Sequence, residues 1–253
     1  MQATRLAQLS AALSEAIGEI GNEGFPARIS KLAEMAGGYE STVIAAFRTG
    51  GRPTRLFSDL SDNDCATTIE PYFTKAYLLD IWYNMVLSHV PDGVYRVMDC
   101  APDDFFNSTY YHTYYKRTRL VDECGVFVWL TDEICVVLML GNRADEGVQN
   151  NGWLSEIADL LPVFSRMIRI HWRDLAALTV APAESLLNMC KEHGLAKRES
   201  EVTAYLLQGH SNKVIARKLG ISPETVKVYR KRINKKLGTS STSQVFAKFF
   251  PQL

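Results

Sequence analysis

Three glycines near the C-terminus set the strongest limit on what this chain can fold into. Gly209, Gly220 and Gly238 directly follow the runs LLQ, ARKL and NKKL, which end stretches of helical periodicity. A helix often ends at a glycine because the residue after its last turn adopts a left-handed conformation. The spacing therefore predicts four short helices between residues 194 and 253.

Serines stand at the predicted starts of three of these helices. Ser211 precedes the second helix and Ser222 the third, where Pro223 occupies the first helical position, in which its missing N–H is not needed. Ser241 and Gln244 have the spacing of a capping box ahead of the fourth helix. The serine starts and the glycine ends delimit the same helices, so this segment is predicted to be an all-α unit.

The third of these helices has two different faces. At 100° per residue, Ile233 and Leu237 each fall within about 20° of Val226, and the three form an apolar stripe. The opposite arc holds Lys227, Val228, Lys231, Arg232 and Lys235. The stripe is expected to face a small core, which turns the cations outward together.

Charge is distributed unevenly along the chain. The whole sequence holds 28 basic and 28 acidic residues, yet residues 191–253 carry 13 Lys or Arg and only 4 Asp or Glu. Residues 1–190 carry the complementary excess of acid. Such a split predicts that the C-terminal unit is drawn to a polyanion and that the remainder is not.

The second and third helices form a helix-turn-helix pattern. They are joined by the short turn Gly-Ile-Ser, and the second partner of the pair carries the outward cations. In this motif the second helix enters the major groove of duplex DNA. Its cations can neutralise phosphates or donate to guanine O6 and N7, and Val228 can touch a thymine methyl group.

The segment LAKRESEVTAYLLQGHSNKVIARKLGISPETVKVYRKRINKKLG resembles the DNA-binding domain of LuxR-type bacterial transcription regulators over roughly residues 195 to 250. The resemblance implies that bases are read from Lys227, Val228 and Lys231. Phosphate contacts are expected from Asn212, Lys213, Thr225, Tyr229, Arg232 and Lys235. It also implies a homodimer that pairs through the fourth helix, with apolar contacts from Val245, Phe246 and Phe249.

The segment departs from the family pattern at two capping positions. Ala196 stands where the family usually has a Thr cap, and Val214 replaces the Glu of a capping box; each loss destabilises by about 1 kcal/mol. Arg230 lies at the edge of the apolar stripe. We expect it to be a structural partner of Glu199 or Glu201 rather than a DNA contact.

Residues 1–178 are predicted to alternate between helices and antiparallel hairpins. Five strands are expected within 39–48, 54–59, 93–99, 123–130 and 133–140. Helices are expected over 25–38, 65–90 and 103–118. An opening helix carries the stripe Leu6, Leu9, Leu13, Ile17 and Ile20, and a closing helix, bent at Pro162, carries Trp153, Ile157, Leu161, Phe164, Ile168 and Trp172.

This order of elements is typical of an α+β domain in which helices cover a sheet. We predict a GAF- or PAS-like sensor and dimerisation domain at 1–178, a linker at 179–193 through the stretch TVAPAE, and a LuxR-type helix-turn-helix domain at 194–253. FFNSTYYHTYY, followed by two strands and a long helix, resembles the sensor half of such regulators. A phosphoacceptor receiver would need a parallel β/α order instead.

Aromatic residues crowd the middle of the sequence and suit the walls of a small-molecule pocket. Our candidates for ligand contacts are Phe47, Tyr72, Trp82, Tyr95, Tyr111 and Trp129. Three alternatives stay open: a ligand-free module for dimerisation or protein docking, a residual enzyme-like domain coupled to DNA binding, and an acyl-homoserine-lactone sensor with a divergent pocket. Asp80 and Trp82 offer an Asp and a Trp of the lactone sensors' signature, but its Pro is absent.

The sequence gives no support for catalysis, a cofactor or a metal site. The five His residues show no metal-ligand spacing, and no nucleophile elbow or phosphate-binding glycine loop occurs. Five scattered Cys without a CxxC pair, no secretion signal and no apolar run of about 20 residues favour a cytoplasmic protein. The prediction is a homodimeric regulator that binds double-stranded DNA and senses a small molecule.

Overall fold

The computed structural model describes residues 2–143, 153–177, 185–251 and 253. The chain forms two compact units. The sheet unit comprises Met1–Cys65, Met85–Cys100 and Leu120–Ala181, and the helical unit comprises Ala66–Asn84, Ala101–Arg119 and Pro182–Leu253. The stretch TVAPAE lies outside the described residues, and the predicted domain boundaries stay a prediction.

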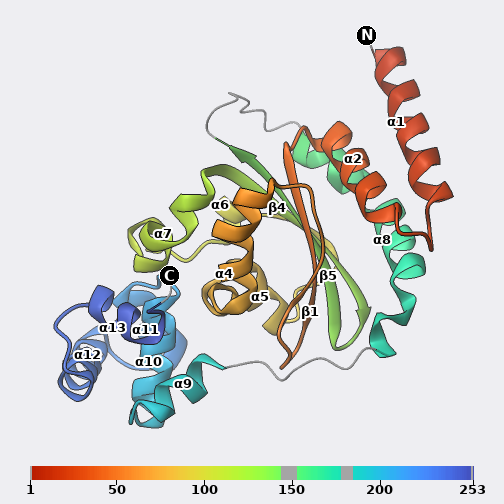
Figure 1. Ribbon diagram of the computed structural model, residues 1–253. Coiled ribbons are helices and arrows are strands. Elements are labelled where there is room, and N and C mark those ends of the chain that lie inside the picture. Colours follow the sequence, from red (N-terminus) through yellow and green to blue (C-terminus); the bar gives the residue numbers. More distant parts are fainter. Residues whose placement is uncertain (1, 144–152, 178–184, 252) are drawn as a thin grey trace. The chain divides into compact units, whose positions relative to one another are not determined.

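The sheet unit is built on one antiparallel sheet of five strands in the order β2-β1-β5-β4-β3 (Figure 1). The strands are β1 (Ser41–Arg48), β2 (Thr54–Ser58), β3 (Gly93–Arg96), β4 (Leu120–Thr131) and β5 (Ile134–Arg143). The hairpin β4–β5 turns at Asp132, as predicted, with Trp129 opposite Cys135. The predicted fold class, α+β with an antiparallel sheet and a C-terminal all-α part, is confirmed.

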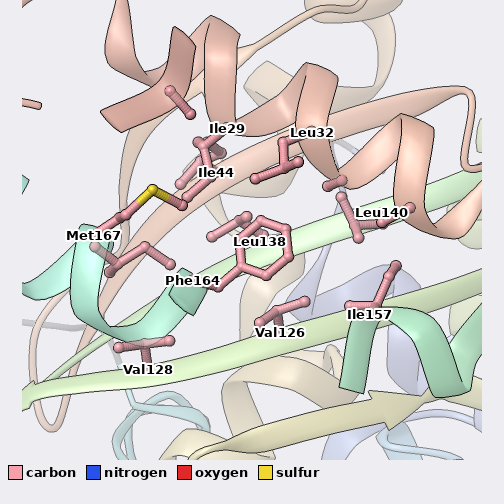
Figure 2. Close-up of a cluster of buried hydrophobic side chains, with 14 of the residues drawn as sticks. Ile29, Leu32, Ile44, Val126, Val128, Leu138, Leu140, Ile157, Phe164 and Met167 are labelled. Carbon is pink, nitrogen blue, oxygen red and sulfur yellow. The ribbon is translucent and has the colours of Figure 1, made fainter. Parts of the chain in front are cut away.

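Helices α2 (Phe25–Gly37) and α8 (Trp153–His171) cover one face of this sheet. Figure 2 shows the buried cluster between these helices and the sheet, with Ile29 of α2, Phe164 of α8 and Leu138 of β5 pointing toward one another. Val126 and Leu138 face this cluster because alternate strand residues share a face. Every second side chain of β4 and β5 therefore lies in this cluster.

The strand residues that alternate with those of the cluster, and so lie on the other face of the sheet, are also buried. Phe47, Phe127 and Val137 are each 0% exposed. Strands buried on both faces read as continuous apolar runs rather than as an alternation. This explains why GVFVWL and ICVVLML contain so few polar residues.

The sheet unit also contains the long helix α1 (Gln2–Gly18) and several short elements, two of which, η1 and α5, continue into the helical unit. The short elements are α3 (Asp62–Asp64), the π-helical η1 (Cys65–Ile69), α5 (Ile81–Leu87), α6 (Val97–Cys100) and the 3₁₀ segment η5 (Arg173–Ala177).

Three sequence predictions for the sheet unit need correction. The stripe on α1 is only partly covered, because Leu6 is 70% and Ile17 52% exposed. The third strand is shorter than predicted, since the backbone turns into α6 at Val97. In the closing helix, Ile157, Phe164, Ile168 and Trp172 are buried as expected, although the helix itself ends at His171 and the side chain of Trp153 lies outside the described residues.

The helical unit contains two groups of elements. The first group is α4 (Glu70–Thr74), the 3₁₀ segments η2 (Ala76–Leu79), η3 (Phe105–Asn107) and η4 (Tyr115–Thr118), and α7 (Thr109–Thr113). The second group is α9 (Leu186–Glu192), α10 (Lys197–Leu207), α11 (Asn212–Leu219), α12 (Pro223–Leu237) and α13 (Thr242–Phe249). The predicted helix over 103–118 is wrong as one element: Ser108 is extended, with ψ of 151°, and starts a new helix as its N-cap.

Phe164→Ala is expected to lower the free energy of unfolding by about 3–5 kcal/mol, because the ring is 0% exposed at the centre of the cluster. Ile170→Ala on the same helix is the matched control, since Ile170 is 39% exposed and should change stability by less than about 1 kcal/mol. Urea denaturation of both variants measures the difference. Equal losses would contradict this assignment of the core.

Candidate nucleic-acid interface

Helices α10 to α13 pack around a small apolar core. Val226, Ile233 and Leu237 of α12 are buried, as the helical wheel predicts, and they are joined by Val202 of α10 and Ile215 of α11. Leu206, Leu219 and Ile221, also predicted for this core, are half-buried. The buried stripe fixes the rotation of α12 about its own axis.

The helix ends are set by the residues that the sequence indicates. Gly209, Gly220 and Gly238 have φ of +89°, +64° and +63°, so each adopts the left-handed conformation. The Ser211 hydroxyl accepts a hydrogen bond from Val214 N–H, and the Ser222 hydroxyl accepts one from Thr225 N–H at 3.1 Å. The predicted caps of α11 and α12 are confirmed.

The predicted capping box of α13 is only half correct. Ser241 accepts from Gln244 N–H at 3.2 Å, as expected. The Gln244 side chain, however, accepts from Ser240 N–H at 2.7 Å rather than from Ser241. The return bond therefore reaches one residue further back than a capping box requires.

The outward face of α12 carries the predicted base-reading residues. Lys227 and Lys231 are exposed, and Val228 is exposed to 49%, a large value for an apolar side chain. Nothing in the described chain covers these three side chains as it covers the stripe on the other side. This face is geometrically free to meet a groove, and base contact by these residues stays a prediction.

The predicted phosphate contacts surround this face. Lys213, Arg232 and Lys235 are exposed, whereas Asn212, Thr225 and Tyr229 are half-buried. The Arg232 guanidinium lies 5.9 Å from the centre of the Tyr229 ring, and the Thr225 hydroxyl lies 2.9 Å from that of Ser222. Tyr229 and Thr225 are thus held in place by neighbours close in the sequence.

Arg230 is a structural residue, but the predicted partners are wrong. Its guanidinium donates to the Asn212 side-chain oxygen at 3.0 Å and to the Thr242 hydroxyl at 3.1 Å. It therefore ties α12 to the starts of α11 and α13. The two acids have other cations as partners: Lys236 lies 2.6 Å from Glu199, and Arg198 pairs with Glu201.

The start of α10 compensates for its missing cap. Ala196 is the N-cap residue and offers no side-chain acceptor, as predicted. The Glu199 carboxylate nevertheless accepts from Ala196 N–H at 2.8 Å. Burial opposes ionisation of Glu199, but the bonds from Lys236 and Ala196 outweigh it and lower its pKa.

Helix α13 does not present the expected pairing surface. Val245, Phe246 and Phe249 are 5%, 2% and 1% exposed, so these side chains are already used inside the helical unit. The Phe249 ring, for example, lies 4.6 Å from the His193 ring. The apolar positions form a stripe, as predicted, but this stripe faces inward.

The six candidate ligand residues are divided between the two units. Phe47, Tyr95 and Trp129 lie in the sheet unit, and Tyr72, Trp82 and Tyr111 lie in the helical unit. The polar atoms of several already have partners: Tyr95 hydroxyl donates to Pro91 O at 2.9 Å and Trp129 Nε1–H to Val90 O at 2.7 Å. A ligand-contacting role for these residues stays a prediction.

Asp80 is a buried acid that is not among the six candidates. It is 5% exposed and accepts hydrogen bonds from the Tyr72 hydroxyl at 2.7 Å and Trp82 N–H at 3.2 Å. Burial raises the pKa of Asp80 to about 6, although these bonds lower it in part. The signal for it in the sequence is an acid between the apolar pairs of LLDIW.

The described residues offer neither a metal site nor a membrane span. Among them, no group of three or more His, Cys, Asp and Glu side chains could hold a metal ion. None of the described helices is both long and apolar enough to cross a membrane. All five cysteines are free thiols.

The C-terminal helices match a known family. Residues 193–249 match the family described as "Bacterial regulatory proteins, luxR family". UhpA of Escherichia coli (strain K12), a transcriptional regulatory protein, is 40% identical over 60 residues, which are 24% of this chain and 31% of UhpA. The chain therefore spans less than a third of that relative.

Two further similarities extend into the rest of the chain. A protein of Aeromonas salmonicida, described as an HTH-type transcriptional regulator in the exeN 3′ region, is 28% identical over 65% of this chain and 89% of that protein. The solved VqsR LBD domain of Pseudomonas aeruginosa matches with a TM-score of 0.57 and 20% identity over 65% of this chain and 96% of that chain. The latter similarity is one of fold.

Asp80→Asn is expected to change how stability depends on pH. The folded pKa of Asp80, about 6, lies above its unfolded value of 3.8, so the folded protein holds the proton more tightly between these values. The contribution of Asp80 to the free energy of unfolding is therefore fully present below pH about 4. About 3 kcal/mol of it is lost as the pH rises through 6. Asn cannot titrate, so the variant should lack this loss. Denaturant unfolding of both proteins from pH 4 to 7 measures it, and a constant difference between the two curves would contradict the assignment.

Proposed function

We propose that the protein is a homodimeric transcription regulator that inserts α12 into the major groove of DNA. The proposal starts from the C-terminal domain, whose residues 193–249 match the LuxR family of bacterial regulatory proteins. Its DNA-binding regulatory class follows from the family match. The base contacts, the dimer and the sensing of a small molecule are the parts that we propose.

One observation carries the proposal: α12 buries one side and exposes a cationic side. Val226, Ile233 and Leu237 anchor the helix, and Lys227 and Lys231 project from the opposite arc. A helix held in this way offers a rigid row of donors to an anionic groove. A merely solvated charged helix does not explain why Val228 is exposed between the two lysines.

The exposed side chains suit different tasks. Lys227 and Lys231 can donate to guanine O6 and N7, and Val228 can contact a thymine methyl group. Lys213, Arg232 and Lys235 suit phosphates, which fix the register without reading sequence. Asn212, Thr225 and Tyr229 can add uncharged hydrogen bonds to the same backbone.

A single domain of this kind reads a short half-site, so we propose that two copies act together on successive half-sites. Since the Val245 stripe is buried, pairing through α13 would use its exposed residues, such as Ala247 and Lys248. The sheet unit is a second candidate for the pairing surface. We place the regulator in the cytoplasm, where bacterial DNA is accessible.

We propose that the N-terminal part of the chain senses a small molecule. The fold that it shares with the VqsR LBD domain and its many aromatic side chains support this. Mass spectrometry of compounds released by denaturing the purified protein tests it, with an unrelated protein purified in parallel as the control. A compound specific to this protein is expected. If none is found, and no compound of a metabolite library raises Tm, a dimerisation or docking module replaces the sensor.

Lys231→Ala is expected to weaken binding to a selected operator by about 1–3 kcal/mol and to relax the preference for one base pair, because one bidentate contact is lost. Selection from a random-sequence duplex library, followed by titration of the selected site, measures both effects. Lys191→Ala is the control, since Lys191 lies outside the matched segment. Unchanged affinity and preference would remove Lys231 from the base-reading set.

Lys235→Ala should weaken binding to all sequences to a similar degree. With one phosphate contact fewer, the variant releases fewer counterions from DNA when it binds. The slope of log K against log salt should therefore become shallower by about 1. Titrations at several salt concentrations measure the slope. A sequence-dependent loss with an unchanged slope would contradict a phosphate role.

A further inference from the structure

An acidic side chain of the helical unit sits on the start of α11. The Asp103 carboxylate accepts a hydrogen bond from Ser211 N–H at 3.1 Å and one from the Ser211 hydroxyl at 2.5 Å. Ser211 is the N-cap of α11, the first helix of the helix-turn-helix pair. A carboxylate from a segment more than 100 residues earlier thus occupies this helix start.

Neighbouring contacts show that the two segments fit each other. Asp104 N–H donates to Gly209 O at 3.1 Å, and the Thr109 hydroxyl lies 3.2 Å from that of Ser243. Gly209 approaches so closely that an added Cβ would lie 3.1 Å from Phe105 Cα. The contact is therefore a small docking surface, in which Asp103 makes the charged part.

Asp103 is ionised at neutral pH. Burial opposes its ionisation, but the two hydrogen bonds from Ser211 outweigh it and lower the pKa of Asp103. Burial lowers the pKa of the neighbouring His210 to about 4, so this ring, 4.0 Å away, is neutral and does not cancel the charge. The partial positive charge of the helix start and the Ser211 donors hold the carboxylate.

The same donors are suited to a DNA phosphate. In a helix-turn-helix domain the first helix crosses the DNA backbone, and helix starts are regular donors to phosphate oxygens. Two of our proposed phosphate contacts, Asn212 and Lys213, are the first residues of α11 and follow Ser211 directly. A carboxylate and a phosphate carry like charges and need the same N–H and hydroxyl groups, so they cannot occupy this place together.

We propose that Asp103 is an internal competitor of DNA, which holds the helix-turn-helix domain in a state of low affinity until the segment around residues 103–109 leaves α11. The inference rests on the proposed function, because it needs α11 to lie on the DNA backbone. By linkage, whatever releases this segment raises DNA affinity, and DNA favours its release by the same factor.

The segment also links the contact to the candidate sensor residues. Ser108, which follows the docked residues, caps α7 and accepts from Tyr111 N–H at 3.0 Å. Tyr111 is one of the six candidate ligand contacts and stacks on Tyr115 at 5.7 Å. A ligand that repositions α7 would therefore move the residues that hold Asp103 in place.

The test compares Asp103→Ala with Asp104→Ala in the full chain. Both variants remove one carboxylate, so they change the net charge equally, but the Asp104 side chain accepts from Asn107 rather than from α11. Fluorescence anisotropy with a mixed-sequence duplex of about 30 base pairs at low salt gives the affinities. Asp103→Ala is expected to bind about fivefold to tenfold more tightly than wild type, and Asp104→Ala less than about twofold.

Equal effects of the two variants, or no gain for Asp103→Ala, overturn the competition. Lys235→Ala, measured in parallel, separates failure of the competition from failure of the proposed function. If Lys235→Ala binds more weakly than wild type, DNA is bound as proposed. If wild type and all variants fail to bind the duplex, both inferences fall. Hydrogen exchange at the Ser211 amide is an independent readout, which should be faster in Asp103→Ala than in Asp104→Ala; equal protection overturns the contact itself.

Discussion

The rest of the C-terminal structure depends on the burial of one stripe of α12. Val226, Ile233 and Leu237 lose contact with water only if the helix keeps one rotation about its axis, and that rotation turns Lys227 and Lys231 outward. Each buried aliphatic side chain contributes roughly 1.5–3 kcal/mol, whereas exposed lysines contribute little to stability. Apolar residues therefore determine which way Lys227 and Lys231 face, and these are the lysines that we propose contact DNA.

The structure follows the sequence-based predictions where the local chemistry of a few neighbouring residues decides it. The glycine ends and serine starts of α11 and α12 follow from backbone conformations that a Cβ disfavours and from N–H groups that need an acceptor. The hairpin β4–β5 follows from two apolar runs around Asp132. The pairing of β1 with β5, almost 100 residues apart, gives no comparable local signal.

Predictions fail where the packing of several elements, rather than the chemistry of one stretch of chain, decides which groups meet. Arg230 donates to Asn212 and Thr242 because three helices meet there, although Glu199 and Glu201 look equally suitable on charge alone. The stripe of α13 is visible in the sequence, but periodicity shows that a face is apolar and does not show what covers it. Asp80 is a lone acid in the sequence, and only the fold places the Tyr72 hydroxyl against it.

The hydroxyl of Ser211 has two roles at once, since it accepts from Val214 N–H and donates to Asp103. Its oxygen can accept the hydrogen bond from the first turn of α11 whether its O–H donates to a carboxylate or to a phosphate oxygen. Exchange of one anion for the other therefore requires no refolding of the helix. A control step of this kind can be fast and reversible. The balance between the docked and the DNA-bound state then depends on the acidity and the length of one side chain, that of Asp103.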